Sequence, residues 1–565
     1  MPPLSAEHQA AAEEVYAAIQ ELTTYIEQSA VIDIQAVADE TGYSPDSVET
    51  VLETFTLAGL TDASEATERF FRGDNPLRTA PIIVDADGRR MLVHDALALP
   101  AAREVIETRL KVAGRTSAYE RNRGRWVEDA ALDLLAETLP GAEVHRAFNY
   151  FVPDPKARVA QNQPSEFTKR VDADGLILVD DVALIVEVKS VALTAEARGG
   201  VARRLQGKLR DIVTAAANQA DRLRERIVID KRIRLDDGKW IDVSGVREIH
   251  TIAVGLEDLS GVTTATSMLV AAGVLKPDHI PWTVSLHDLR IICEILDRPC
   301  ELLLYLRRRT NPDATKRYLA VDELDLYLHF LNHGLYVEPN PHQLAKALPW
   351  AGEPNAASLG RYTNQGRELI ESQTEPLDAW YAALLDPSHP EADKPRLPGD
   401  PALLKLVDEI APRQQPGWLS TTTMLLEGSA QVQHTFGRHA RDLALAVKQD
   451  GQHHSVTHIM TDTAVNSFVL VWVCCGRDEP VDIISQYLRS YLSAKKHQAG
   501  AQRAALMLFA TQGTTLLELM FDNREPGPDA DLDRAASQLV PLEGMKAAAP
   551  RPAHPQRTRS RRKRR

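Results

Sequence analysis

Two charged residues stand at the end of an apolar run in residues 182–190, VALIVEVKS. Continuous runs of Val, Ile and Leu are typical of strands that are buried on both faces. A charged side chain in such a strand loses its water, and this cost must be offset by an ion-pair partner, a metal ion or a change in pKa. Glu187 and Lys189 are therefore the first candidates for chemistry.

The element that positions these two residues is predicted to be a β-hairpin. A second apolar segment, VDADGLILV, comes before residues 182–190, and Asp180 and Asp181 join the two segments. Asp tolerates the left-handed backbone of a two-residue turn better than most residues do. This turn sets Val179 opposite Val182, and period-two alternation then gives the hairpin one apolar face. That face consists of Gly175, Ile177, Val179, Val182, Leu184, Val186 and Val188.

The other face of the hairpin carries the charges. The same register places Asp174 opposite Glu187 and Asp172 opposite Lys189, and like charges on opposed strand positions destabilise a sheet. A divalent cation between Asp174 and Glu187 would turn this repulsion into ligation, and oxygen ligands suit Mg²⁺ or Mn²⁺. The structural alternatives are that Lys189 pairs with Asp172 or is a charge on an edge strand. Asp172 is also the alternative to Asp174 as a metal ligand.

Two polar residues interrupt the apolar faces of predicted helices on either side of the hairpin. Glu128 begins a line at helical spacing that continues through Leu132, Leu135 and Leu139. A carboxylate on such a stripe needs a metal or a partner, and an ion pair with Arg125 explains it equally well. In the second helix Gln219 lies among apolar residues, where its amide needs hydrogen-bond partners. Those neighbours are Ile212, Ala216 and Leu223.

The order of these residues resembles that of the PD-(D/E)XK nuclease superfamily. A helix Glu, a strand Asp, a strand Glu-x-Lys and a helix Gln follow one another over residues 121–225. They are Glu128, Asp174, Glu187, Lys189 and Gln219. The sequence EVKS after an apolar strand looks most like the nuclease-related domain (NERD) and methyl-directed restriction branches. The chain departs from the family pattern at Ala173, where the family name has Pro, and in its Gln-x-x-Arg sequence at Gln219.

The resemblance implies a Mg²⁺-dependent nuclease that hydrolyses phosphodiester bonds. It implies that Asp174 and Glu187 hold one or two Mg²⁺ ions, with Mn²⁺ as an alternative, together with the Val188 carbonyl and Glu128. Lys189 is expected to orient the attacking water, and Gln219 to complete the site. DNA is the expected substrate, in defence against foreign DNA or in DNA repair, while RNA stays open because no feature of the sequence reads a 2′-hydroxyl. The alternative is a catalytically inactive nuclease fold that binds nucleic acid or regulates another protein.

The fold class is predicted to be α/β and multidomain. An N-terminal helical, helix-turn-helix-like domain is expected to precede a central PD-(D/E)XK-like mixed-sheet core and a C-terminal α/β domain. The expected segments are 1–75 helical, 76–120 connecting, 121–258 nuclease-like, 259–385 mainly helical, 386–401 a Pro-rich linker, 402–545 the C-terminal domain and 546–565 a disordered basic tail.

The first and last of the folded domains are predicted from local patterns. Residues 34–60 place apolar positions around a Gly42 turn and a Ser44-Pro45 helix start, which resembles a helix-turn-helix. Its second helix is acidic, so a structural or protein-contact role is favoured over a DNA groove. In the C-terminal domain, two apolar runs, SFVLVWVCC and AALMLFAT, flank a helical pattern and predict a parallel pair of strands. A second copy of the chain or another protein is the expected partner of either domain.

The composition of the chain indicates its cellular location and the distribution of its charge. The chain has 565 residues, no apolar run long enough for a membrane helix and no signal-peptide pattern at its start, so a cytoplasmic location without membrane contact is expected. The formal net charge is −14, and nine Lys or Arg lie in the last twenty residues. The remainder of the chain therefore carries −23, and its basic tail could contact a phosphate backbone.

Overall fold

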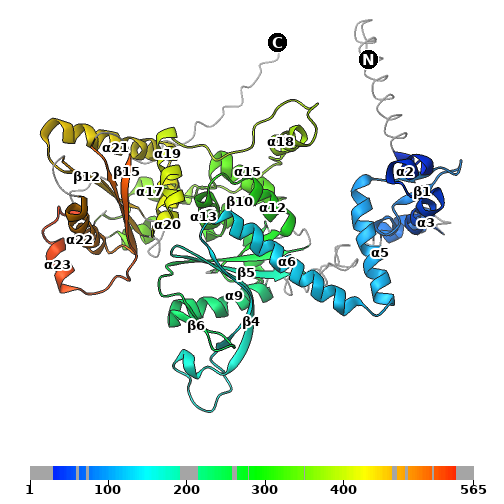
Figure 1. Cartoon of the computed structure of the whole chain (residues 1–565), viewed down its shortest axis with the longest axis horizontal. Coiled ribbons are helices and arrows are strands. Elements are labelled where there is room, and N and C mark those ends of the chain that lie inside the picture. The colour runs from blue at the N-terminus through cyan, green and yellow to red at the C-terminus, as the bar shows by residue number, and fades with distance from the viewer. Residues whose placement is uncertain are drawn as a thin grey trace, which may run out of the picture. The chain divides into compact units, whose positions relative to one another are not determined.

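The structure is a computed structural model, and it divides the chain into two compact units that are described separately (Figure 1). The first holds described residues up to Arg125 and the second those from Trp126 onward. The described residues are 30–58, 63–71, 75–190, 214–256, 264–277, 279–348, 350, 352–460, 467–476, 481–511 and 515–542. Residues 1–29 of the predicted helical segment 1–75 and the whole basic tail, 546–565, lie outside them.

The first unit contains the predicted helix-turn-helix. Helix α2 ends at Gly42, whose φ of 75° is the left-handed conformation that glycine adopts without strain. Helix α3 begins at Pro45, and the Ser44 hydroxyl accepts a hydrogen bond from the Ser47 N–H. A short hairpin lies beside this pair, because Val31 bridges to Met91 on its second strand. The elements are α2 (Ile34–Thr41), α3 (Pro45–Phe55), α4 (Ala63–Phe71), β1 (Ile82–Val84), β2 (Arg90–Leu92) and α5 (Ala98–Val112).

The second unit is built on a five-stranded mixed sheet with the order β3-β4-β5-β8-β9. The first three strands are antiparallel, whereas β5, β8 and β9 run parallel to one another. A two-stranded hairpin, β6 and β7, packs beside them. The strands are β3 (Glu143–Val152), β4 (Lys169–Val179), β5 (Val182–Lys189), β6 (Arg232–Arg234), β7 (Trp240–Asp242), β8 (Glu248–Gly255) and β9 (Trp282–Ser285). The mixed sheet and the β4–β5 hairpin agree with the sequence prediction.

Helices cover both faces of this sheet. Helix α6 (Thr116–Thr138) packs its predicted leucine stripe on the apolar face of the β4–β5 hairpin. Gly175 permits this close approach, because a Cβ atom there would lie 2.5 Å from Leu132 Cδ2. Helix α9 (Ala215–Glu225) packs on the opposite face, where Ala220 and Leu223 contact the side of β5 that carries Ala183 and Ile185. Each helix therefore brings its residues to a different face.

The rest of the second unit is mainly helical and ends in a second sheet. The order of that sheet is β12-β13-β14-β15, and β13 and β14 are parallel, as the two apolar runs predicted. Strands β10 (Tyr318–Ala320) and β11 (Glu368–Ile370) form a small parallel pair. The other strands are β12 (His454–Met460), β13 (Phe468–Cys474), β14 (Arg503–Phe509) and β15 (Leu516–Asp522). The helices are α11 (Thr266–Ala271), α12 (Leu286–Ile295), α13 (Pro299–Arg309), α14 (Pro312–Arg317), α15 (Glu323–His333), α16 (Pro341–Ala347), α17 (Ala356–Thr363), α18 (Glu375–Leu385), α19 (Pro401–Ile410), α20 (Trp418–Glu427), α21 (Ala430–Asp450), α22 (Val481–Ala499) and α23 (Ala530–Ala536).

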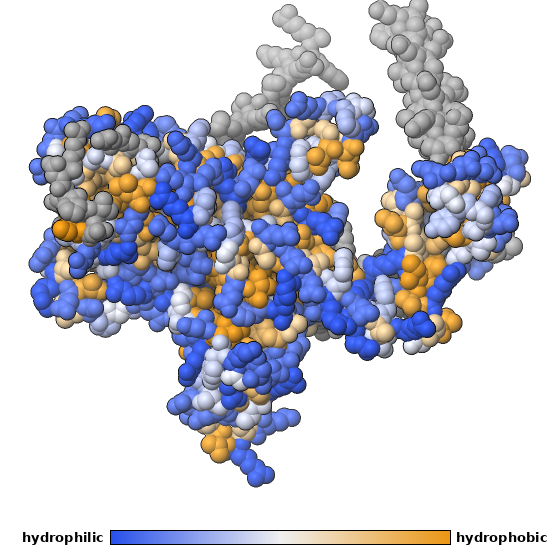
Figure 2. All heavy atoms as spheres, in the orientation of Figure 1, coloured by the Kyte–Doolittle hydropathy of each residue, from blue (hydrophilic) through white to orange (hydrophobic). Residues whose placement is uncertain are grey.

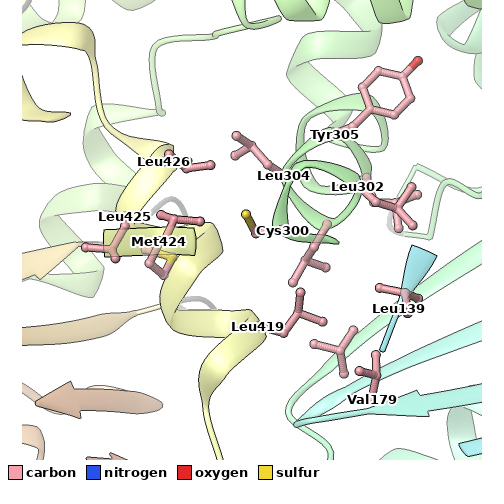
Figure 3. Packing of buried hydrophobic residues seen from close by; sticks show 14 of the residues in the cluster. Leu139, Val179, Cys300, Leu302, Leu304, Tyr305, Leu419, Met424, Leu425 and Leu426 are labelled. Carbon is pink, nitrogen blue, oxygen red and sulfur yellow. The ribbon is translucent and has the colours of Figure 1, made fainter. Parts of the chain in front are cut away.

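One hydrophobic core joins the two sheets of the second unit. Val179 of the hairpin, Leu302 of α13 and Leu419 of α20 belong to the same cluster of buried side chains (Figure 3). The segment between α18 and α19 is Pro-rich and has no regular structure, and it is held at Lys394, which contacts Asp297. The predicted nuclease-like and C-terminal segments thus share one compact body. The positions of the domain boundaries stay predictions.

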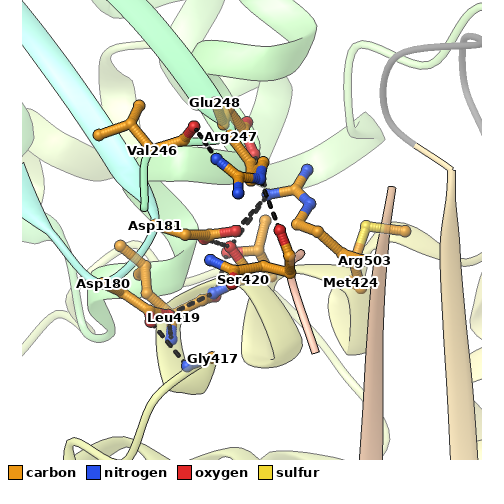
Figure 4. Close-up of polar contacts among 12 residues, drawn as sticks. Asp180, Asp181, Val246, Arg247, Glu248, Gly417, Leu419, Ser420, Met424 and Arg503 are labelled. Carbon is orange, nitrogen blue, oxygen red and sulfur yellow. Dashed lines mark hydrogen bonds and ion pairs between the residues drawn. The ribbon is translucent and has the colours of Figure 1, made fainter. Parts of the chain in front are cut away.

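A buried network of charged groups fixes the tip of the hairpin to the C-terminal segment (Figure 4). The Asp180 carboxylate accepts hydrogen bonds from the Gly417, Leu419 and Ser420 N–H groups at the start of α20. Burial and the neighbouring Asp181 raise the pKa of Asp180 to about 7, against the effect of these donors. The turn that sets the register of the hairpin is therefore also an anchoring point.

No helix within the described ranges combines the length and the apolarity that crossing a bilayer requires.

Candidate active site

The register of the β4–β5 hairpin agrees with the prediction up to the candidate site. Asp180 has a φ of 55°, and Val179 pairs with Val182. The pairing continues through Gly175 opposite Val186 and ends there. The apolar face is buried as expected, in contact with the leucine stripe of α6.

Beyond Gly175 the two strands depart from a regular ladder. Asp174 is not a paired position on either side, and Ala147, which would face it on β3, has a positive φ of 34°. The Asp174 carboxylate instead accepts a hydrogen bond of 2.7 Å from the Val188 N–H. The break in the ladder thus turns Asp174 toward β5, and the Val188 backbone meets it through its N–H group.

Lys189 lies between the two carboxylates that were expected to face each other. Its Nζ atom is 3.3 Å from Asp174 Oδ2 and 3.4 Å from Glu187 Oε2. The alternative pair of Lys189 with Asp172 does not form: Asp172 is exposed and its Cα pairs with Asn149 of β3. The cause is the ladder break at Asp174, which replaces the regular register on which that expectation rested.

Glu187 is the most buried member of this trio, with 1% of its side chain exposed against 15% for Asp174. Burial, and then the negative charge of Asp174, raise the pKa of Glu187 from its ordinary 4.5 to about 8, although Lys189 lowers it. Near neutral pH Glu187 is therefore held mainly in its protonated form.

Helix α9 covers the face on which Glu187 lies. Glu187 follows Ala183 and Ile185 at period-two spacing, and α9 packs on those two residues. Gln219 is half-buried on α9, as its position between Ala216 and Leu223 predicted. The structure thus places Gln219 on the same side of the sheet as Glu187.

Glu128 approaches from the other side of the sheet. It is half-buried on α6, one turn before Leu132, and Leu132 packs against Gly175. The helical stripe was predicted correctly, since Leu132, Leu135 and Leu139 are all buried. Helix α6, however, packs on the face of the sheet opposite to the one that α9 covers. Glu128 and Gln219 therefore lie on different sides of the sheet.

Sequence reasoning missed two residues beside Glu187. Tyr150 of β3 is completely buried, and no hydrogen bond of regular geometry reaches its hydroxyl from the described part of the chain, although Arg222 interacts with it. Burial raises the pKa of Tyr150, Arg222 of α9 lowers it, and Glu187 raises it further, so the three groups are neighbours. The alternation Phe148, Tyr150, Val152 could have indicated an inward Tyr. Arg222 is the Arg of the Gln-x-x-Arg departure.

The side chains at the site decide whether it fits the metal that the resemblance implies. In the described ranges, no group of three or more His, Cys, Asp or Glu side chains is placed to hold a metal ion. Mg²⁺ does not require such a group, because it is commonly bound through one or two carboxylates together with waters and substrate phosphates. Asp174 and Glu187, which share the contact with Lys189, fit a Mg²⁺ site of that kind.

Comparisons with known proteins do not assign the chain to a family. No family model matches the chain, and neither the curated proteins nor the solved structures contain a significant match.

Proposed function

We propose that this chain is a Mg²⁺-dependent nuclease that hydrolyses phosphodiester bonds of DNA, in defence against foreign DNA or in DNA repair. The single observation that carries the proposal is the convergence of Asp174, Glu187 and Lys189 at the point where the β4–β5 ladder opens. A buried acid with a raised pKa next to a second acid and a lysine is an arrangement typical of functional sites. The central position of β5 in the sheet gives the rigidity that positioned chemistry needs.

The proposed roles follow from the contacts of each side chain. Asp174 and Glu187 would hold the cation, and the Val188 N–H keeps one Asp174 oxygen in place. A bound Mg²⁺ would supply Lewis-acid polarisation of the phosphodiester and a lowered pKa for an attacking water. Lys189 has three donors, so it can orient that water and offset charge that develops on the phosphate oxygens.

The remaining predicted residues have supporting roles in the proposal. Gln219 would act from α9 on the face that carries Glu187. The resemblance implies the Val188 carbonyl and Glu128 as further oxygen ligands, and Glu128 would have to act from α6, on the face of the sheet opposite to that of Gln219. The raised pKa of Glu187 means that cation binding releases a proton, so affinity for Mg²⁺ should increase as the pH rises toward about 8.

A second function is favoured by one observation. Lys189 contacts both carboxylates, and such an ion-paired trio can be stable without a metal. A nuclease fold that binds nucleic acid or regulates a partner without cleaving is therefore the alternative. Cleavage that depends on a divalent cation separates the two functions.

The test is cleavage of DNA by the full-length protein. Supercoiled plasmid, single-stranded DNA and RNA are incubated with Mg²⁺, Mn²⁺, Ca²⁺ or EDTA. Asp174→Asn, Glu187→Gln and Lys189→Ala are expected to abolish cleavage in Mg²⁺. Asp172→Asn is the matched control, since Asp172 is an exposed acid two residues before Asp174 on the same strand. Wild-type protein that cleaves none of the substrates in either Mg²⁺ or Mn²⁺ would overturn the proposal, as would full activity of Glu187→Gln.

A further inference from the structure

The loop between β3 and β4, with the first two residues of β4, projects beyond the candidate site as a basic arm, defined as residues 153–170. In Figure 1 it extends from the sheet, and Figure 2 shows hydrophilic side chains over much of it, with a small apolar patch near its tip. The arm carries four Lys or Arg and two Asp or Glu, whereas the chain as a whole has 79 acidic and 65 basic residues. Its charge is therefore opposite to that of the rest of the body.

Three cations of the arm are available to a ligand. Lys156, Arg158 and Lys169 are exposed and form no ion pair with any described residue. The fourth, Arg170, is bound to Asp236 of the β6–β7 hairpin at 2.8 Å. Exposed cations without acidic partners keep their full charge for an external anion.

The acids of the arm do not neutralise these cations. The Asp154 carboxylate accepts a hydrogen bond from the Lys156 backbone N–H, and Glu166 accepts hydrogen bonds from the backbone N–H groups of Asn162 and Gln163. Both acids are therefore engaged by the backbone of the loop, where they hold its shape.

The arm is braced against the sheet, so its cations have a fixed support. Phe167 is 3% exposed, and the Arg226 guanidinium stacks over its ring at 5.1 Å. Arg234 of β6 donates hydrogen bonds to the carbonyl groups of Ser165 and Phe167 and stacks over Phe151. A supported array of charges loses less conformational entropy on binding than a flexible one does.

We propose that the basic arm binds the phosphate backbone of the nucleic acid on one side of the cleavage point. This inference rests on the proposed nuclease function and identifies the surface that would bind the nucleic-acid substrate. Lys169 and Asp174 are five residues apart on β4, which corresponds to roughly 17 Å along a strand. At about 3.4 Å per nucleotide, the arm would contact phosphates about five nucleotides from the scissile bond.

The experiment measures binding apart from cleavage. Full-length protein with Ca²⁺ in place of Mg²⁺ is titrated against fluorescent single-stranded and duplex DNA by anisotropy, over about 50 to 200 mM salt. The test variant is Lys156→Gln, Arg158→Gln, Lys169→Gln. The control variant is Arg438→Gln, Arg441→Gln, Lys448→Gln, which removes the same charge from the exposed face of α21. Both variants keep the basic tail.

The arm variant is expected to bind DNA more weakly and with a flatter salt dependence. Loss of three phosphate contacts lowers the log–log salt slope by about 2 for single strands and nearly 3 for duplex DNA. Substrates with fewer than about five nucleotides on the arm side should bind wild type and the arm variant equally. If the arm and control variants bind long DNA with equal affinities and salt slopes, the proposal that the arm binds phosphate is wrong, even if wild type cleaves DNA. If the arm variant binds DNA more weakly as expected but wild type does not cleave DNA, only the proposed nuclease activity is wrong.

Discussion

Arg503 of β14 donates a hydrogen bond of 2.8 Å to Glu248, the first residue of β8, and both side chains are almost completely buried. The same Glu248 receives two hydrogen bonds from Arg307 and one contact from His250. These cations hold the pKa of Glu248 well below its ordinary value although burial acts in the opposite direction. Since β8 pairs with β5, this ion pair connects the C-terminal sheet to the strand that bears Glu187.

Arg503→Met should destabilise the protein by about 3 kcal/mol, because it removes one partner of a buried ion pair and leaves Glu248 less compensated. The matched control is Arg489→Met. Arg489 pairs with Glu518 but is 58% exposed, so its loss should cost less than about 1 kcal/mol. Urea midpoints of the two variants check the difference. Equal midpoints would show that the buried network adds no stability.

Loss of the Glu187 proton at high pH should make the metal-free protein less stable. Its pKa rises from 4.5 to about 8 on folding, so the folded state holds the proton more tightly than the unfolded state. The stabilisation is complete below about pH 4.5 and is lost as the pH rises through about 8, at up to about 1.4 kcal/mol per pH unit. In EDTA, wild type should therefore lose about 2 kcal/mol more than Glu187→Gln between pH 6 and pH 8.

The same pair of proteins tests the cation. Mg²⁺ should raise the melting temperature of wild type, more at pH 8 than at pH 6, and should not raise that of Glu187→Gln. Glu301→Gln is the control, because Glu301 is also buried and has its pKa raised to about 7, by burial above all. It should keep the response to Mg²⁺. If Mg²⁺ does not raise the melting temperature of wild type and Glu187→Gln is destabilised in EDTA, then Asp174, Glu187 and Lys189 have a structural role only.

Tyr150→Phe should leave the protein equally stable or more stable by about 1 kcal/mol, since a buried hydroxyl without a hydrogen bond of regular geometry is costly. Tyr327→Phe is its control: Tyr327 is equally buried, and its hydroxyl also lacks a hydrogen bond of regular geometry with the described residues. Only Tyr150→Phe is expected to slow cleavage, because only Tyr150 lies beside Glu187. Thermal melts and initial rates measure both effects. A clear loss of stability in Tyr150→Phe would show that its hydroxyl is satisfied in solution.

Gly175→Ala should destabilise the protein by about 1 to 3 kcal/mol, because the new Cβ would overlap the buried Leu132 side chain. The cost should fall when Leu132→Ala is also present, so that the two changes are not additive. Gly245→Ala is the control, since its Cβ would meet no atom within 4 Å. Additive unfolding free energies for Gly175→Ala and Leu132→Ala would contradict the contact.

The hairpin and its faces could be predicted because they depend on local rules. Alternation of side chains and the Asp180-Asp181 turn fix which residues face α6, and the structure has this register. The partner of Lys189 could not be predicted from the same rules. A break in the ladder at Asp174 changes the direction of one side chain, and nothing in the alternation signals it.

The long-range contacts of the site were beyond sequence reasoning for a different reason. Tyr150 and Arg222 meet beside Glu187 only through the packing of β3 and α9 on the sheet. The two sheets share one hydrophobic core because residues that are far apart in the sequence, such as Val179 and Leu419, belong to the same cluster of buried side chains. Residue periodicity identifies an apolar face, but it does not identify which distant segment covers it.

The ion pair between Arg503 and Glu248 also sets an order of events during protein synthesis. The two residues are 255 positions apart, so Glu248 leaves the ribosome long before its partner is made. At about 5 to 20 residues per second, this interval lasts roughly 10 to 50 s. Arg307, only 59 positions after Glu248, can pair with it in the meantime. Glu248 of strand β8 therefore gains its partner Arg503 only after 255 further residues have been made, and the nascent chain completes this support of its candidate site only after β14 has emerged.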